Sequence, residues 1–219
     1  MVKPAVDLLT IMAHPDDAEL WAGATIAAAQ SAVIAVTAHD PIRDAEAAAG
    51  AGILGARLER LPDVSVASVQ QLLRRLAPQV VITHHVDDVH PDHRRTAEIV
   101  ISALPDVVIE TGLPARVYTC DGYNNLDRHG RPIYLPIMIN ASGQWETKIR
   151  ALRSHSSQPI VEHFGPMAEV LGRLHGLRIG TQYAEAFAPV PVLGRLPETA
   201  GLFGPCPEHA DADAGRISA

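Results

Sequence analysis

The chain has 219 residues, and its formal net charge is −7. A chain of this length suits one domain and buries about 70% of its unfolded surface, so it can fold around an ordinary hydrophobic core. Lys and Arg together number only 18 and form no long basic run, which argues against a nucleic-acid partner. No stretch approaches the about 20 apolar residues of a membrane span.

The two cysteines, Cys120 and Cys206, lie far apart in the sequence. Two such residues form neither a disulfide framework nor a zinc ribbon. The N-terminal apolar stretch is short and runs into Asp16 and Asp17, unlike the layout of a signal peptide. We therefore expect a reduced, cytoplasmic protein.

The first half of the chain alternates short apolar runs with longer helix-like patterns. Near-continuous apolar strands separated by helices are typical of a parallel sheet that is covered on both faces. We expect Pro105 to end the last of these helices. The runs predict strands over residues 5–13, 32–38, 58–61 and 79–83, and helices over 17–30, 43–54, 66–76 and 93–104.

This alternation predicts an α/β fold: a Rossmann-like, doubly wound, mostly parallel sheet with helices on both faces, in a three-layer sandwich. We expect one domain over residues 1–203 and a mobile tail over 204–219, which is rich in Pro, Gly, Ala and Asp. The second half is less regular, with strands expected over 117–120 and 137–139 and helices over 145–155 and 161–174.

Two clusters of His and Asp follow the first and fourth predicted strands. In open α/β sheets, ligands bind at the carboxyl ends of the strands, where the strand order reverses. In a 3-2-1-4 order those two strands are neighbours, so we expect the clusters to meet in one crevice. The clusters read Ala13-His14-Pro15-Asp16-Asp17-Ala18-Glu19 and Asp87-Asp88-Val89-His90-Pro91-Asp92-His93.

The local chemistry of both clusters favours a divalent metal. Pro15 suits the first turn of a helix, and the carboxylates that follow it lie near the positive end of the helix dipole. Ionised carboxylates and neutral imidazoles are the ligands that a zinc-type cation needs. A single Asp at a helix start is a cap and a single loop histidine is solvated, but two such elements at one crevice indicate a metal site. His84 and His85, at the end of the fourth strand, are read as core or loop residues, with an outer contact to the metal site left open.

The first cluster resembles the Ala-His-Pro-Asp-Asp-x-Glu signature of the LmbE-like, or PIG-L, zinc-dependent de-N-acetylases. The second, over residues 88–93, resembles that family's Asp-x-His-Pro-Asp-His element. Two weaker matches keep the family's order: an Arg-x-x-Glu element at 43–46, and a Lys-x-x-Ala element at 148–151 followed by His-x-Ser-Gln at 155–158. The likeness covers about residues 5–190.

The resemblance implies a role for each matching residue. It implies a bound Zn²⁺, with another divalent metal such as Fe²⁺ as the alternative. It also implies that a metal-bound water molecule attacks the amide of an N-acetylated sugar. The implied metal ligands are His14, Asp17 and His93. The implied catalytic residues are Asp16 as general base, His90 as oxyanion stabiliser or acid for the leaving amine, and Asp92 to orient His90.

The pocket that would select the substrate departs from the family pattern. The loop at 38–42 lacks the family's Gly/Glu-rich stretch, and Asp87 and Asp88 stand where some members carry a tyrosine. Arg43, Asp88 and His155 are the candidates for substrate contact, although a salt bridge at the start of a helix is an equal reading for Arg43.

The reading that fits these features best is a hydrolase that removes acetyl from an N-acetylated amino sugar or a GlcNAc-type conjugate. A set of two His and one carboxylate also suits non-haem iron enzymes, although those usually have β-rich folds. A third reading is a metal-stabilised sugar-binding domain without catalysis. The sequence identifies neither the acylated sugar nor the oligomeric state, and a homo-oligomer stays open.

Overall fold

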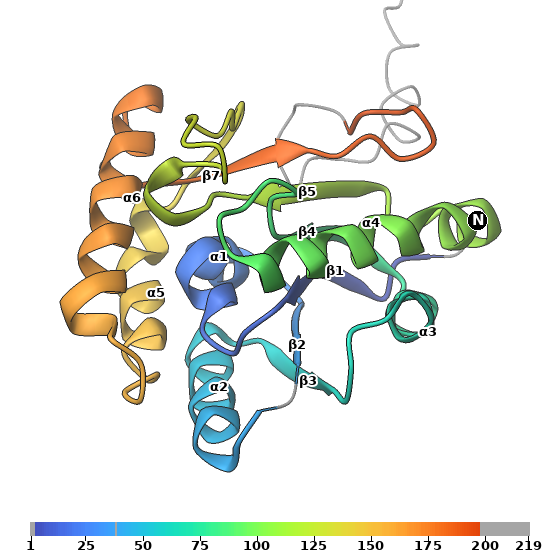
Figure 1. Cartoon of the computed structure of the whole chain (residues 1–219), viewed down its shortest axis with the longest axis horizontal. Helices are drawn as coiled ribbons and strands as arrows, with labels where there is room; N and C mark the ends of the chain where they lie inside the picture. The colour runs from blue at the N-terminus through green and yellow to red at the C-terminus, as the bar shows by residue number, and fades with distance from the viewer. Residues whose placement is uncertain (1–2, 38, 198–219) are drawn as a thin grey trace, which may run out of the picture.

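The computed structural model describes residues 3–37 and 39–197 (Figure 1). Seven strands form one sheet in the order β3-β2-β1-β4-β5-β7-β6. The strands from β3 to β5 in this order are parallel, and β7 runs antiparallel to both β5 and β6. The strands are β1 (Val6–Met12), β2 (Ala32–Thr37), β3 (Arg57–Leu61), β4 (Pro78–Thr83), β5 (Arg116–Cys120), β6 (Ile137–Asn140) and β7 (Ala184–Pro189).

Helices cover both faces of the sheet, which confirms the predicted three-layer α/β fold. Alternate side chains along each strand point to opposite faces: Leu8 packs under α1, α2, α5 and α6, whereas Leu9 packs under α3 and α4. The helices are α1 (Asp17–Ala28), α2 (Pro41–Leu54), α3 (Val66–Leu76), α4 (Pro91–Thr111), α5 (Trp145–Leu152) and α6 (Gly165–Ile179), with short turns η1 (Tyr123–Asn125), η2 (Ser142–Gln144) and η3 (Ile160–Phe164).

The predicted end of the fourth helix at Pro105 is wrong. Helix α4 continues through Pro105 to Thr111 and ends at Gly112, which has a φ of 78°. A proline inside a helix removes one hydrogen bond and crowds the carbonyl four residues earlier. Here Leu104 and Val107 on either side of it are both buried in the core under the sheet, and this burial favours continuation of the helix.

The C-terminal elements also differ from their predicted bounds. The helix expected over 161–174 begins as the π-helical turn η3 and continues as α6 to Ile179. Strand β7 was not predicted, because its sequence Ala-Glu-Ala-Phe-Ala-Pro has few of the β-branched and aromatic residues that mark strands. It nevertheless closes the gap between β5 and β6, where Phe187 is fully buried.

The tail predicted over 204–219 lies outside the described residues. Within residues 3–37 and 39–197, no helix combines the length and apolar character needed to cross a membrane.

Candidate metal centre and active site

The loops after β1 and β4 lie side by side, as the predicted strand order requires. Strands β1 and β4 pair in parallel at the centre of the sheet. Beyond the paired residues, the Ala13 N–H donates to His84 Nε2 (2.9 Å), and the Thr83 hydroxyl donates to the Ile11 carbonyl (2.9 Å). These bonds fix the two strand ends to each other, so the polar residues that follow them converge on one edge of the sheet.

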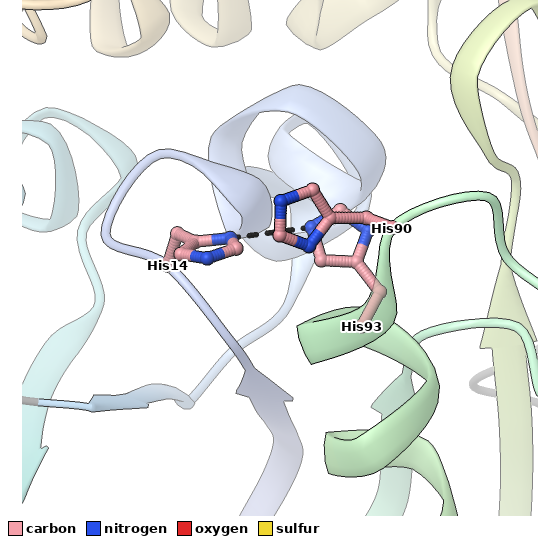
Figure 2. A group of neighbouring side chains, drawn as sticks. All are labelled: His14, His90 and His93. Atoms are coloured by element: carbon pink, nitrogen blue, oxygen red, sulfur yellow. Dashed lines mark hydrogen bonds between the residues drawn. The ribbon is translucent and has the colours of Figure 1, made fainter.

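Three potential metal donors converge there. His14 Nδ1 lies 3.2 Å from Asp17 Oδ2 and 3.2 Å from His93 Nε2. His93 Nε2 in turn lies 3.3 Å from Asp17 Oδ1. Bonds of about 2.1 Å at tetrahedral angles place two ligands of zinc about 3.4 Å apart. The donor set therefore fits a zinc-type ion, and Figure 2 shows the rings of His14 and His93 pointing toward each other with His90 beside them.

Among residues 3–37 and 39–197, two overlapping groups could hold a metal: His14, His90 and His93, or Asp17, His84 and His93. His84 is poorly suited as a ligand, because its Nε2 already accepts the Ala13 N–H. Burial lowers the pKa of His84 and so favours its neutral form. Its ring stacks on His93 with centroids 3.8 Å apart. His84 thus packs behind His93, a candidate ligand, in the position that an outer contact to the metal site would have.

Asp88 has the position of an outer partner for a metal ligand. It is fully buried. Its Oδ2 lies 3.1 Å from His93 Nδ1, and its Oδ1 accepts the His90 N–H (2.7 Å). A carboxylate behind a ligating histidine fixes the ring and raises its basicity. Burial alone would lower the pKa of His93, but the Asp17 and Asp88 carboxylates raise that pKa to about 10. The same negative potential favours a bound cation.

Asp16 and Asp17 have different electrostatic environments. Burial would raise the pKa of Asp17, but the adjacent His93 and His84 rings hold it well below its usual range. Burial and the neighbouring Asp17 carboxylate raise the pKa of Asp16, and the Arg43 guanidinium opposes this shift from 2.8 Å. Of the two carboxyl groups, Asp17 is the better metal ligand and Asp16 has the raised pKa that a general base needs.

His90 caps the N-terminus of α4. Its Nδ1 accepts the Asp92 backbone N–H (3.2 Å), so the neutral ring carries its proton on Nε2. The Asp92 carboxylate lies 4.0 Å from His90 Nδ1 but 3.5 Å from His14 Nε2, and it is 63% exposed. In this structure the Asp92 backbone, rather than its carboxylate, holds the His90 ring.

The three candidate substrate contacts point into the protein. Arg43 pairs with Asp16, and Asp88 is buried behind His93. His155 is fully buried, 3.5 Å from Glu19 Oε1. For Asp88 and His155 the expected substrate contact disagrees with the structure, because a fully buried side chain has no face open to a substrate.

Other neighbours of the site were not singled out from the sequence. Tyr123 stacks on His93 at 5.7 Å between centroids, and the His39 ring lies 6.0 Å from that of His14 in an edge-on arrangement. Glu46 accepts hydrogen bonds from Ser156 and Ser157. The Arg-x-x-Glu and His-x-Ser-Gln elements were the available signal for this last contact, since each carries one side of it.

Comparison with known proteins supports this description. A family model described as PIG-L, GlcNAc-PI de-N-acetylase, matches residues 37–104. A curated relative, the 1D-myo-inositol 2-acetamido-2-deoxy-alpha-D-glucopyranoside deacetylase 1 of Saccharopolyspora erythraea, is 29% identical in a match that covers 44% of this chain and 39% of that protein. The match therefore spans less than half the length of that relative.

Solved structures share the fold over most of the chain. The conserved protein TT1542 from Thermus thermophilus has a TM-score of 0.73 and 25% identity, and the match covers 86% of this chain and 96% of that one. The N,N'-diacetylchitobiose deacetylase from Pyrococcus horikoshii has a TM-score of 0.64 and 19% identity, with 84% of each chain covered. The matches, the fold and the two His-Pro-Asp motifs agree with the resemblance to the PIG-L, or LmbE-like, family, whose model matches residues 37–104 of this chain.

Proposed function

We propose that this protein is a metal-dependent hydrolase that removes an acetyl group from an N-acetylated amino sugar or a GlcNAc-type conjugate. One observation carries the proposal: the mutual distances of 3.2–3.3 Å among His14 Nδ1, the Asp17 carboxylate and His93 Nε2. Two imidazoles and one carboxylate are a ligand set of catalytic zinc sites, where a fourth position stays open. We propose Zn²⁺ as the ion, with Fe²⁺ as the alternative.

The side chains around the donors supply the remaining chemistry of amide hydrolysis. When bound, a zinc-type ion lowers the pKa of a water molecule to about 7 and polarises a carbonyl oxygen. Asp16, held by Arg43, accepts the proton of the attacking water. His90 presents Nε2–H, because its Nδ1 is occupied by the Asp92 N–H, and so donates to the developing oxyanion or to the leaving amine.

The names of similar proteins support the substrate class. The curated relative is named as a deacetylase of an acetamido-glucopyranoside, and the family model is described as a GlcNAc-PI de-N-acetylase. An N-acetyl group on an amino sugar is common to both names. We propose that Tyr123 and His39, whose rings lie beside those of His93 and His14, contribute to the choice of sugar conjugate.

The two other readings account for fewer features of the site. A non-haem iron enzyme would use the same three donors, but it would have no need for a carboxylate of raised pKa beside them. A sugar-binding domain without catalysis would need neither Asp16 nor His90 in their present positions. Metal analysis of the purified protein and the oxygen dependence of turnover separate these readings from hydrolysis.

The decisive experiment measures acetate release by the metal-loaded protein from a panel of N-acetylglucosamine derivatives: the free sugar and its nucleotide-, inositol- and malate-linked forms, with an antibiotic-linked one added. We expect acetate release from at least one member, and we expect His14→Ala to lose both acetate release and bound zinc. The control variant Asp63→Ala changes an exposed acid elsewhere and should keep both the activity and the zinc. No release from any N-acetyl sugar would overturn the proposed function.

A further inference from the structure

One face of α2 carries three contacts to the rest of the molecule. Arg43, Glu46 and Gly50 are spaced so that they lie on the same side of the helix. Arg43 contacts Asp16, and Glu46 contacts the loop at 154–158. A Cβ at Gly50 would collide with Glu19 and would lie 3.1 Å from His155 Nε2. This face of α2 is therefore fitted closely between α1 and the 154–158 loop.

We propose that Glu46 is a positioning residue that holds Arg43 against Asp16. The expected effect of Glu46 on deacetylation rests on the proposed function, in which Asp16 is the general base. Glu46 does not touch the metal donors or Asp16 in any contact described above. It acts through the placement of α2, one turn away from Arg43.

Glu46 is anchored more strongly than any other residue on this face. Its Oε1 accepts the Ser157 N–H (2.7 Å) and the Ser156 hydroxyl (3.0 Å), and its Oε2 accepts the Ser157 hydroxyl (2.6 Å). The backbone carbonyl of Glu46 also accepts the Ser154 hydroxyl (3.3 Å). Hydrogen bonds to a charged acceptor are about twice as strong as neutral ones, so this carboxylate fixes α2 to the loop.

The backbone of Arg43 is held by the cap of α2, where its N–H donates to Asp40 Oδ1 (3.1 Å), but its side chain has few contacts. Its side chain makes one ion pair, from Nη2 to Asp16 Oδ1 at 2.8 Å. Its Nε is buried and has no hydrogen-bond partner among the described residues. A guanidinium held by a single contact depends on where its helix places it. Contacts of Asp40 and Asp44 hold the first turn of α2, and Glu46 holds the next turn against the 154–158 loop. The anchoring of Glu46 therefore contributes to the position from which Arg43 reaches Asp16.

A merely structural role for Glu46 predicts a different result from a positioning role. If Glu46 only fastens the 154–158 loop, its loss and the loss of Arg43 have independent effects. If Glu46 holds Arg43 in place, removing Arg43 has little further effect once Glu46 is gone. A double-mutant cycle measures this difference directly.

The experiment compares Glu46→Ala, Arg43→Ala and the double variant in two measurements. In denaturant unfolding of the metal-free protein, we expect Arg43→Ala to change the unfolding equilibrium constant at least about fivefold less in the Glu46→Ala background than in the wild type. In deacetylation, we expect Glu46→Ala to lower kcat with little change in KM, and the double variant to be no slower than Arg43→Ala.

Matched controls keep the outcome unambiguous. Glu59→Ala removes a carboxylate that pairs with Arg75 on another part of the sheet, and the effect of Arg43→Ala should be unchanged in that background. If Glu46→Ala does not fold, the variant Ser156→Ala takes its place in the double-mutant cycle, because it removes one of the hydrogen bonds that anchor Glu46. Additive effects in the unfolding cycle would overturn the positioning role. A wild type without deacetylase activity would overturn the proposed function instead, and the unfolding cycle would still decide the positioning role.

Discussion

Two buried charged clusters lie against helix α1, one at its middle and one at its N-terminus, and their hydrogen-bonding groups are satisfied in different ways. In its middle, Lys148 Nζ donates to the Leu20 carbonyl (2.7 Å) and to Glu185 Oε1 (2.6 Å). Glu185 also accepts the N–H groups of Ala24 (3.0 Å) and Thr25 (2.8 Å) and the Thr25 hydroxyl (2.6 Å). We call this pair the Lys148–Glu185 clamp. Its ammonium group donates to oxygen acceptors, and its carboxylate accepts from N–H and O–H donors.

At the N-terminus of α1, two imidazole nitrogens face each other beside a shared carboxylate. His14 Nδ1 and His93 Nε2 lie 3.2 Å apart, and both face the Asp17 carboxylate. Neutral imidazole nitrogens and carboxylate oxygens that converge in this way are best satisfied together by a cation. A buried cluster that satisfies itself indicates a structural role, whereas one that converges on a common point indicates a ligand.

The largest expected effect is on catalysis, from Asp16→Asn at the N-terminus of α1. Asn keeps an oxygen that can accept from Arg43 but cannot take a proton from water. We expect kcat to fall by about 10²- to 10⁴-fold, the usual contribution of a general base, with the zinc content unchanged. Steady-state kinetics and metal analysis check this. Activity close to that of the wild type would remove Asp16 from the base role.

The next effect is on stability, from Lys148→Met in the clamp. The substitution leaves Glu185 charged and buried without its cation, which costs about 3–5 kcal/mol. Urea unfolding should show this loss, and Lys148→Met with Glu185→Gln should recover a large part of it because both charges are removed. A single variant as stable as the double variant would contradict the view that the clamp is a charge pair.

A smaller effect is expected from Gly50→Ala, which tests the close fit between α2 and the residues behind the proposed metal site. The added Cβ would collide with Glu19, and overpacking of this kind costs about 1–3 kcal/mol. Gly52→Ala in the same helix is the matched control, since a Cβ there meets nothing within 4 Å. Gly-to-Ala changes in open helical positions stabilise by up to about 1 kcal/mol. Equal unfolding free energies for the two variants would argue against the close fit.

The smallest effect is expected at the surface, from Arg75→Ala. Arg75 pairs with Glu59 at 3.1 Å, and its side chain is 55% exposed. Exposed ion pairs contribute about 0.2–1 kcal/mol. Equilibrium unfolding should place this variant within that range, well below Lys148→Met. A loss as large as that of the clamp would mean that burial does not separate the two kinds of ion pair.

The sequence predicted the elements that repeat a simple pattern. Apolar strands alternating with helices gave the parallel part of the sheet, and strand order alone brought His14 next to His93. The bounds of α4 could not be predicted, because the burial of Val107 outweighs the helix-breaking effect of Pro105 only in the packed structure. Strand β7 could not be predicted either, since its residues favour strands only weakly.

Within the site, residue types were predictable and contacts between distant residues were not. The donors fall inside short motifs, so their local spacing was visible. Whether Asp88 faces substrate or His93 depends on how the chain turns after β4. The contact between Glu46 and Ser157 joins residues 111 positions apart. The two weak motifs each contain one side of this contact, but neither motif indicates that the two sides meet.

Asp88 has a consequence for how this protein can change over evolutionary time. Its Oδ1 accepts a hydrogen bond from the His90 backbone N–H, and its Oδ2 faces the ring of His93. A single carboxylate thus serves both the residue proposed to act on the substrate and a residue proposed to bind the ion. A replacement at this position would alter affinity for the ion and orientation of the acid in one step, so the two properties cannot be adjusted independently from here.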